Sequence, residues 1–163
     1  MDIHQLNTLV KQGESHYLEF KKSTTQLKAA VETLCAFLNS KGGIILIGVK
    51  DNGQILGQQV SDRTKQEIAN EIRKIEPHAH IEVHYVAIGD AKQLIVIDVP
   101  AGKHAPYVFD GRPFERNQST TEKMTQHRYE QLIVNRGQLN HSWEDHLANG
   151  YIPIQLEGTG FIV

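Results

Sequence analysis

The stretch Gly13-Glu-Ser-His-Tyr-Leu-Glu-Phe-Lys-Lys-Ser23 decides the fold of this chain of 163 residues. Its centre, residues 17–21, alternates apolar or aromatic with charged side chains, and this alternation predicts a short β-strand. Because side chains along a strand point alternately to opposite faces, Leu18 and Phe20 are expected on a core face. The remaining side chains of the strand then form a second, charged face.

The charged face of this strand allows two interpretations. Glu19 and Lys21 lie side by side on it, and Glu14 stands just upstream, where the chain enters the strand. Two carboxylates and a lysine near one spot suit a hard divalent cation and a phosphate group. The simpler interpretation is a half-buried strand with a solvated charged face, and this stretch by itself favours the simpler one.

Composition restricts the class of protein. Apolar residues make up 39% of the chain and charged residues 22%, which is typical of a globular domain. The net charge of −2 neither supports nor excludes a nucleic-acid partner. No apolar run approaches the length of a membrane span, and the N-terminus lacks the signal-peptide pattern. The single cysteine, Cys35, is expected in the core. We therefore expect a cytoplasmic protein with no membrane partner.

Helical and strand patterns alternate along the chain. Apolar spacing predicts helices over residues 1–12, 25–38 and 61–75, and capping-box spacing from Ser119 to Glu122 predicts a helix that continues to about residue 136. Apolar runs bounded by turn residues predict strands over 44–50, 54–57, 81–85, 94–99, 107–109 and 112–116. The strands form hairpins with helices between them, which predicts an α+β domain with a mixed, largely antiparallel sheet and helices packed on it.

The chain divides into one domain and a shorter extension. We assign residues 1–136 to the domain and residues 137–163 to a less regular C-terminal extension. Trp143 is expected to anchor the extension, and the final Phe161-Ile-Val is apolar enough for an edge strand or a dimer contact. The extension is expected to pack on the same domain or on a dimer partner.

Five short motifs follow one another in a recognisable order. They are Glu14-x4-Glu19-Phe-Lys, Ala36-Phe-Leu-Asn39, Gly42-Gly-x4-Gly48-Val-x-Asp51-x-Gly53-x3-Gly57, Pro106-Tyr-Val and Gly111-Arg-x-Phe-x-Arg116-x2-Ser119-Thr. With these motifs the chain resembles the Schlafen-type Alba-like domain, a family described as DNA-binding, over about residues 10–136. The resemblance implies the α+β fold of one Schlafen core lobe.

The resemblance also implies an activity and partners. In animal Schlafens two such lobes pack as a pseudo-dimer, and some of these proteins are endoribonucleases that cleave tRNA and rRNA with three acidic residues and a divalent metal. Glu14 and Glu19 match two of the acidic positions in type and spacing, and Asp51 matches the third. The implied cofactor is Mg²⁺ or Mn²⁺, and a chain with one lobe is expected to form a homodimer.

The residues support a metal site independently of the resemblance. Asp51 follows the second predicted strand, and pairing of that strand with the first brings its carboxylate toward Glu14 and Glu19. Three carboxylates held together raise one another's pKa, and a bound Mg²⁺ or Mn²⁺ removes this repulsion and provides a Lewis acid for phosphodiester cleavage. Lys21, on the same face as Glu19, is then expected to hold the scissile phosphate or the developing charge. The alternative for Asp51 is an ordinary hairpin turn.

Basic and hydroxyl side chains are the candidate phosphate contacts: Lys21, Lys22, Lys41, Lys103, Arg112, Arg116, Ser119 and Thr120. The two arginines flank a hairpin arm that ends at the predicted helix cap, and a helix N-terminus beside arginines is a natural anion site. The alternative is a solvated hairpin with a satisfied cap. Tyr107, Phe109 and Phe114 are candidates for base stacking, although aromatic residues of such a hairpin are more often core residues.

The nine histidines add weaker candidates. His78, His80 and His84 lie near one predicted strand, where Glu82 shares a face with two of them, and these residues suggest a zinc site without an evident fourth ligand. His16 lies near the acidic residues and is a candidate for proton transfer.

Three functions remain open from the sequence. The first is a metal-dependent endonuclease acting on RNA, with tRNA-like or rRNA-like substrates. The second is a non-catalytic nucleic-acid-binding domain, such as a DNA-binding transcriptional regulator, in which the carboxylates are structural and the basic hairpin binds phosphate. The third is a partner-binding domain that touches no nucleic acid, which the acidic net charge allows.

Overall fold

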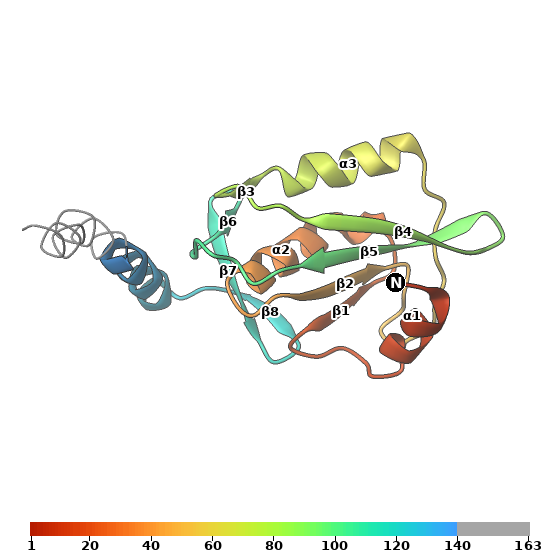
Figure 1. Ribbon diagram of the computed structural model, residues 1–163, viewed down its shortest axis with the longest axis horizontal. Helices are drawn as coiled ribbons and strands as arrows, with labels where there is room; N and C mark the ends of the chain where they lie inside the picture. Colours follow the sequence, from red (N-terminus) through yellow and green to blue (C-terminus); the bar gives the residue numbers. More distant parts are fainter. Residues whose placement is uncertain (140–163) are drawn as a thin grey trace, which may run out of the picture. The chain divides into compact units, whose positions relative to one another are not determined.

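A computed structural model describes residues 1–139 and divides the chain into two compact units (Figure 1). The first unit is Met1–Thr125, and it holds every strand described below. The second unit begins at Gln126, and its residues 126–139 are helical. The predictions for Trp143 and the final apolar segment lie outside the described residues. Within the described part of the chain, no helix is both long and apolar enough to cross a membrane.

The first sheet has four strands in the order β1-β2-β5-β4. The strands are β1 (Leu18–Lys21), β2 (Gly43–Ile47), β4 (Glu82–Gly89) and β5 (Lys92–Val99). β1 and β2 run parallel, whereas β2–β5 and β5–β4 are antiparallel pairs. The pairing of the first two strands, on which the predicted metal site depends, is therefore present, and the predicted α+β fold with a mixed, largely antiparallel sheet is confirmed.

Helices cover both faces of this sheet. α2 (Leu27–Leu38) and α3 (Asp62–Ile72) belong to the larger apolar cluster, together with the inward side chains Ile45 and Ile97. α1 (Ile3–Val10) belongs to a second cluster on the opposite face, with Leu18 and Phe20. Because strand side chains alternate, Leu18 and Phe20 face α1, so Glu19 faces α2.

The second sheet is antiparallel and has the order β3-β6-β7-β8. Its strands are β3 (Ile75–Glu76), β6 (Val108–Phe109), β7 (Arg112–Asn117) and β8 (Thr120–Lys123). Phe109 and Phe114 of this sheet are buried in the larger cluster with α2. The second sheet therefore closes the face of α2 that the first sheet leaves open.

Two predicted elements differ from the structure of the described residues. The second arm of the predicted hairpin at 54–57 is reduced to an isolated bridge between Val49 and Ile55. The helix predicted to begin at Ser119 is also wrong at that position, because Thr120–Lys123 pairs with β7 as a strand and the helix begins only at residue 126. The capping-box spacing is misleading here, since threonine residues also favour a strand.

Candidate nucleic-acid interface

The charged face of β1 is buried rather than solvated. Glu19 is only 7% exposed, because its face of β1 lies against α2 and the second sheet. Lys21 Nζ donates to Glu19 Oε1, and Arg116 Nη2 lies 2.8 Å from Glu19 Oε2. The Glu19 carboxylate is thus held between two cations, which compensates the cost of burying its charge.

Arg116 connects the two sheets. Its guanidinium donates to the carbonyl of Ser15 at 2.7 Å and to Thr121 Oγ1 at 3.0 Å, and it lies over the ring of Phe37. It also donates to the carbonyl of Leu18 at 3.3 Å. The side chain of Arg116 has no exposed surface. The prediction that Arg116 contacts phosphate is therefore wrong, because its donors are directed at the protein.

Glu14 protects the open edge of β1. β1 is an outer strand of the first sheet, and outer strands leave backbone groups without a strand partner. The segment before β1 folds back on this edge: Ser15 N–H donates to the Leu18 carbonyl at 2.9 Å, and Phe20 N–H donates to Glu14 Oε1 at 3.0 Å. Burial raises the pKa of the Glu14 carboxyl, the Phe20 N–H partly opposes this, and the charges of Glu19 and Asp51 add to it.

These contacts leave little room for the predicted metal site. Asp51 is an exposed residue of a tight turn, in which Gly53 N–H donates to the Lys50 carbonyl at 2.8 Å. Glu14 and Glu19 already accept from a backbone N–H and from two cations. Among residues 1–139, no three histidine, cysteine, aspartate or glutamate side chains are grouped so that they can hold a metal ion. The three carboxylates therefore do not fit a metal ion in this arrangement.

Ser119 and Thr120 do not form an anion site at a helix N-terminus. They follow the turn between β7 and β8, where Gln118 adopts a left-handed conformation, and Thr120 pairs with Asn117 across the hairpin. The next residue, Thr121, uses its hydroxyl inside the protein, with Thr33 Oγ1 at 2.8 Å. The prediction that this turn caps a helix is wrong, because no helix begins there; phosphate contact by Ser119 and Thr120 stays a prediction.

The exposed basic candidates separate into three places. Lys22 follows the C-terminal end of β1, and Arg112 lies at the turn between β6 and β7. Lys41 and Lys103 lie at the opposite end of the first sheet, where β2 begins and β5 has ended. The two loops that carry these lysines touch, since Gly102 N–H donates to the Leu38 carbonyl at 2.9 Å. Lys41 and Lys103 are therefore the pair of predicted phosphate contacts that the fold brings to one region.

Gly42 explains why the two lysine loops are so close. Its φ is +82°, and a Cβ at this position would lie 2.5 Å from the carbonyl oxygen of Val99 and 2.9 Å from the backbone N of Ala101. Only glycine fits both the left-handed conformation and this approach. The Gly42-Gly43 pair of the sequence motif thus has a structural role beside Lys41.

Tyr17 lies at the same end of the sheet and is the exposed aromatic residue of the motif. Its side chain is 50% exposed, whereas Tyr107, Phe109 and Phe114 are buried and belong to the core. The Tyr17 carbonyl accepts from Ile44 N–H at 2.8 Å, which fixes the residue beside the start of β2. The ring of His16 contacts the Tyr17 ring edge-on, with 4.9 Å between ring centres. The sequence pattern placed Tyr17 outside the core but gave no sign of this position.

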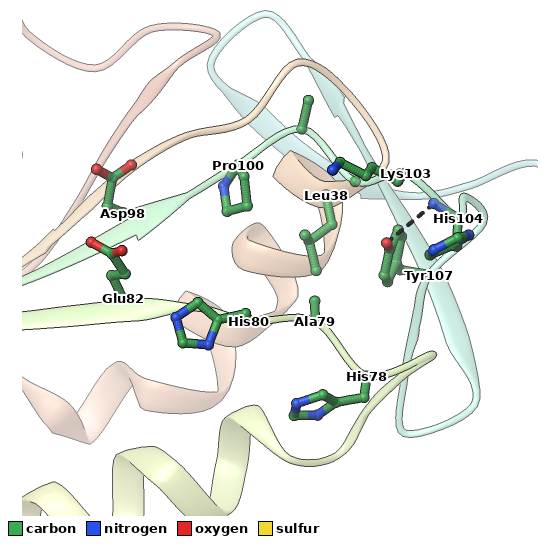
Figure 2. Close-up of a pocket in the computed structure, with 12 residues that line it drawn as sticks. Leu38, His78, Ala79, His80, Glu82, Asp98, Pro100, Lys103, His104 and Tyr107 are labelled. Carbon is green, nitrogen blue, oxygen red and sulfur yellow. Dashed lines mark hydrogen bonds between the residues drawn. The ribbon is translucent and has the colours of Figure 1, made fainter.

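A pocket of about 520 Å³ opens at this end of the first sheet (Figure 2). Leu38, Ala79, Pro100 and Tyr107 supply apolar surface, and the polar side chains are His78, His80, Glu82, Asp98, Lys103 and His104. Figure 2 shows Glu82 and Asp98 at one end of the pocket and Lys103, His104 and Tyr107 at the other. The backbone N–H of His104 donates to the Tyr107 hydroxyl at 3.2 Å.

The predicted zinc site is not formed by the described residues. His78 and His80 line the pocket, but His84 instead lies 3.4 Å from Glu82 on the same face of β4. No group of three ligands for a metal is present within residues 1–139. Sequence spacing missed Asp98 and His104 as partners of this region, because they come from β5 and the loop after it.

Comparison with known proteins places this geometry in a family. The model of the family described as Schlafen, AlbA_2 matches residues 14–125. The N-terminal domain of a RecG-related protein from Nitrosomonas europaea, described as an ATP-dependent DNA helicase, has a similar structure, with a TM-score of 0.58 and 22% identity over 77% of this chain and 93% of that domain.

A crystal structure of a protein from Corynebacterium diphtheriae gives a TM-score of 0.53 with 15% identity. That match covers 75% of this chain but only 30% of the other, so this chain spans less than a third of the length of that protein. No curated protein matches the chain. At these identities the structural neighbours show the fold alone.

Proposed function

The chain belongs to the Schlafen AlbA_2 family, and from this premise we propose that it binds single-stranded nucleic acid at the end of the first sheet that holds Tyr17, Lys41 and Lys103. The two lysines contact phosphates, and Tyr17 stacks on a base. This function needs no metal ion, which agrees with the use of Glu19 inside the protein. We propose RNA as the preferred ligand, following the resemblance of the sequence motifs.

The position of Tyr17 is the observation that supports this proposal most. Half of its side chain is exposed, and its backbone is fixed by the hydrogen bond to Ile44 N–H. Domains that bind single strands combine an aromatic platform with cations that follow the backbone, and stacking contributes about 1–3 kcal/mol per base. Lys41 lies three residues before Ile44, so the aromatic platform and a cation stand beside the same strand.

Lys41 and Lys103 give the proposal a measurable electrostatic signature. Each lysine that neutralises a phosphate of a single strand releases counterions, with a contribution of about −0.7 to the slope of log K against log salt. Two contacts therefore predict a slope of about −1.4 from these lysines. A weak salt dependence fits a chain whose net charge is −2.

The test is fluorescence anisotropy with a labelled oligouridylate and the matching deoxyribonucleotide. Tyr17→Ala is expected to weaken binding without changing the salt slope, whereas Lys41→Ala is expected to weaken it and reduce the slope. Lys92→Ala is the matched control, because Lys92 is exposed at the other end of β5. Equal binding by all three variants and the unmodified chain would overturn the proposed surface.

A metal-dependent RNA endonuclease is the second candidate function. The observation that favours it is the electrostatic interaction of Glu14 with Glu19 and Asp51, which adds to the raised pKa of Glu14. For this activity Glu14, Glu19 and Asp51 would have to release their present partners and hold Mg²⁺ or Mn²⁺, with Lys21 near the phosphate. Incubation with tRNA, rRNA and single-stranded DNA in Mn²⁺ tests the nuclease activity. Cleavage by the unmodified chain that is lost in Asp51→Ala would favour a nuclease over a protein that only binds nucleic acid.

Self-association is the remaining part of the proposal. The resemblance implies that two lobes pair, and β4 is an outer strand of the first sheet, a position from which strands can pair between chains. Light scattering on the purified chain tests this directly. A homodimer mass supports the pairing, and a monomer at binding concentrations contradicts it.

A further inference from the structure

The pocket beside Lys103 has a donor and acceptor pattern that points to one kind of base. We propose that it binds a guanine of the nucleic acid, with Glu82 and Asp98 accepting hydrogen bonds from the base and Lys103 contacting the adjacent phosphate. This inference rests on the proposed nucleic-acid binding and names the base that the surface selects.

The two carboxylates form a pair of neighbouring hydrogen-bond acceptors at one end of the pocket. Glu82 and Asp98 are directly opposite each other on β4 and β5, and both residues are exposed. Like charges directly opposite on neighbouring strands destabilise a sheet. His84 Nε2 lies 3.4 Å from Glu82 Oε2, whereas Asp98 forms no ion pair among residues 1–139. A ligand edge with two adjacent hydrogen-bond donors relieves the repulsion, and the absence of a three-ligand metal group among residues 1–139 makes a metal ion a poorer fit.

Guanine is the base with two adjacent donors. Its N1–H and N2–H₂ groups stand side by side on the Watson–Crick edge, whereas adenine, cytosine and uracil present an acceptor next to each donor. An acceptor on the base is repelled by a carboxylate. Sequence-specific recognition of single strands generally uses this edge, together with stacking or apolar contact on the base face.

The rest of the pocket fits a nucleotide. Pro100 is exposed and Ala79 is half-buried, so these two residues supply the accessible apolar surface of the pocket. Leu38 and Tyr107 are almost fully buried, and the Tyr107 hydroxyl accepts from the His104 N–H. The volume of about 520 Å³ is within the usual range for small-ligand sites. Figure 2 places Lys103 across the pocket from the carboxylates, where a phosphate attached to the bound base would lie. The carboxylates and the apolar surface therefore lie where the base would bind, and Lys103 lies where its phosphate would bind.

The test compares U-rich RNA oligomers whose central base is guanine, inosine or adenine. Because inosine keeps N1–H and lacks only the 2-amino group, it isolates the second donor. The unmodified chain is expected to bind the guanine oligomer about tenfold more tightly than the adenine oligomer, with inosine between them. Glu82→Gln and Asp98→Asn are expected to remove this preference while they retain binding to the uridine-only oligomer.

Asp90→Asn is the matched control. Asp90 is an acidic residue at the far turn of the same hairpin, with a φ of +51° that asparagine also tolerates. This variant is expected to keep the full guanine preference. Equal binding of the guanine and adenine oligomers by the unmodified chain would overturn the pocket assignment and leave the proposed binding surface standing.

A mononucleotide titration separates the two proposals. Guanosine and inosine 5′-monophosphates, added without RNA and followed by NMR shifts of the pocket residues, test the pocket directly. Binding of the guanosine nucleotide without binding of any oligomer would support the pocket and overturn the nucleic-acid function. If neither the guanosine nucleotide nor any oligomer bound, the pocket assignment and the proposed nucleic-acid binding would both be overturned.

Discussion

Replacement of Arg116 tests whether the motif residues of β1 and β7 are structural. The Arg116 side chain is fully buried and lies 2.8 Å from Glu19 Oε2, 2.7 Å from the Ser15 carbonyl and 3.0 Å from Thr121 Oγ1. Removing one partner of a buried ion pair costs about 3–5 kcal/mol, because the remaining charge loses a counter-charge. Here the buried Glu19 would keep only Lys21 as a cationic partner. With a urea slope of about 2 kcal/mol/M, Arg116→Met is expected to lower the unfolding midpoint by about 2 M.

The assay is urea unfolding followed by far-UV circular dichroism, with a double-mutant cycle. Glu19→Gln combined with Arg116→Met removes both charges, so the double variant is expected to be more stable than Arg116→Met alone. Arg63→Ala is the control, because Arg63 forms an exposed pair with Glu67 and is expected to contribute no more than about 0.5 kcal/mol. If Arg116→Met cost no more than Arg63→Ala, the structural role of Arg116 would be refuted.

Three further predictions concern single side chains of the first unit. Glu14→Gln is expected to be more stable than the unmodified chain at neutral pH, because the raised pKa of Glu14 means that folding disfavours its charged form. In urea titrations the difference in unfolding free energy should shrink as the pH falls through the raised pKa, and it should vanish below the ordinary value of 4.5. Cys35, whose pKa burial raises to about 12, is expected to react with a thiol reagent only at the rate of unfolding, and rapid labelling of the folded chain would contradict its burial. Asn39→Ala is expected to lose at least about 3 kcal/mol of unfolding free energy, because the side chain bonds the N–H and carbonyl of Tyr107 and the carbonyl of Phe114; a loss below about 1 kcal/mol would contradict this role.

The alternation of β1 and the apolar runs of β2 and β5 correctly predicted these three strands of the first sheet. These patterns depend on local periodicity, which the sequence contains in full. The same periodicity placed Glu19 and Lys21 on one face, but it did not show that α2 and the second sheet cover that face. The simpler interpretation of a solvated face was therefore wrong for Glu19, since solvation depends on elements almost a hundred residues away, such as Arg116.

The candidate site also depends on contacts between distant segments that local sequence patterns do not show. The predicted basic residues were chosen by type, and only the loop contacts through Gly42 and Gly102 bring Lys41 and Lys103 to one region. The helix predicted at Ser119 failed because its capping pattern occurs in a hairpin whose threonine residues pair with β7. The family resemblance identified Glu14 and Glu19 as motif residues. The structure shows that Glu14 accepts from the Phe20 N–H and that Glu19 pairs with Lys21 and Arg116, and motif spacing does not reveal these structural contacts.

Titration of labelled oligouridylate in EDTA, with the unmodified chain and with the double variant Tyr17→Ala and Lys41→Ala, tests whether the chain binds RNA without a metal ion. We expect the same affinity in EDTA and in Mg²⁺, intact RNA, and much weaker binding by the double variant. Binding that requires the metal ion, or a double variant that binds as well as the unmodified chain, would contradict this expectation.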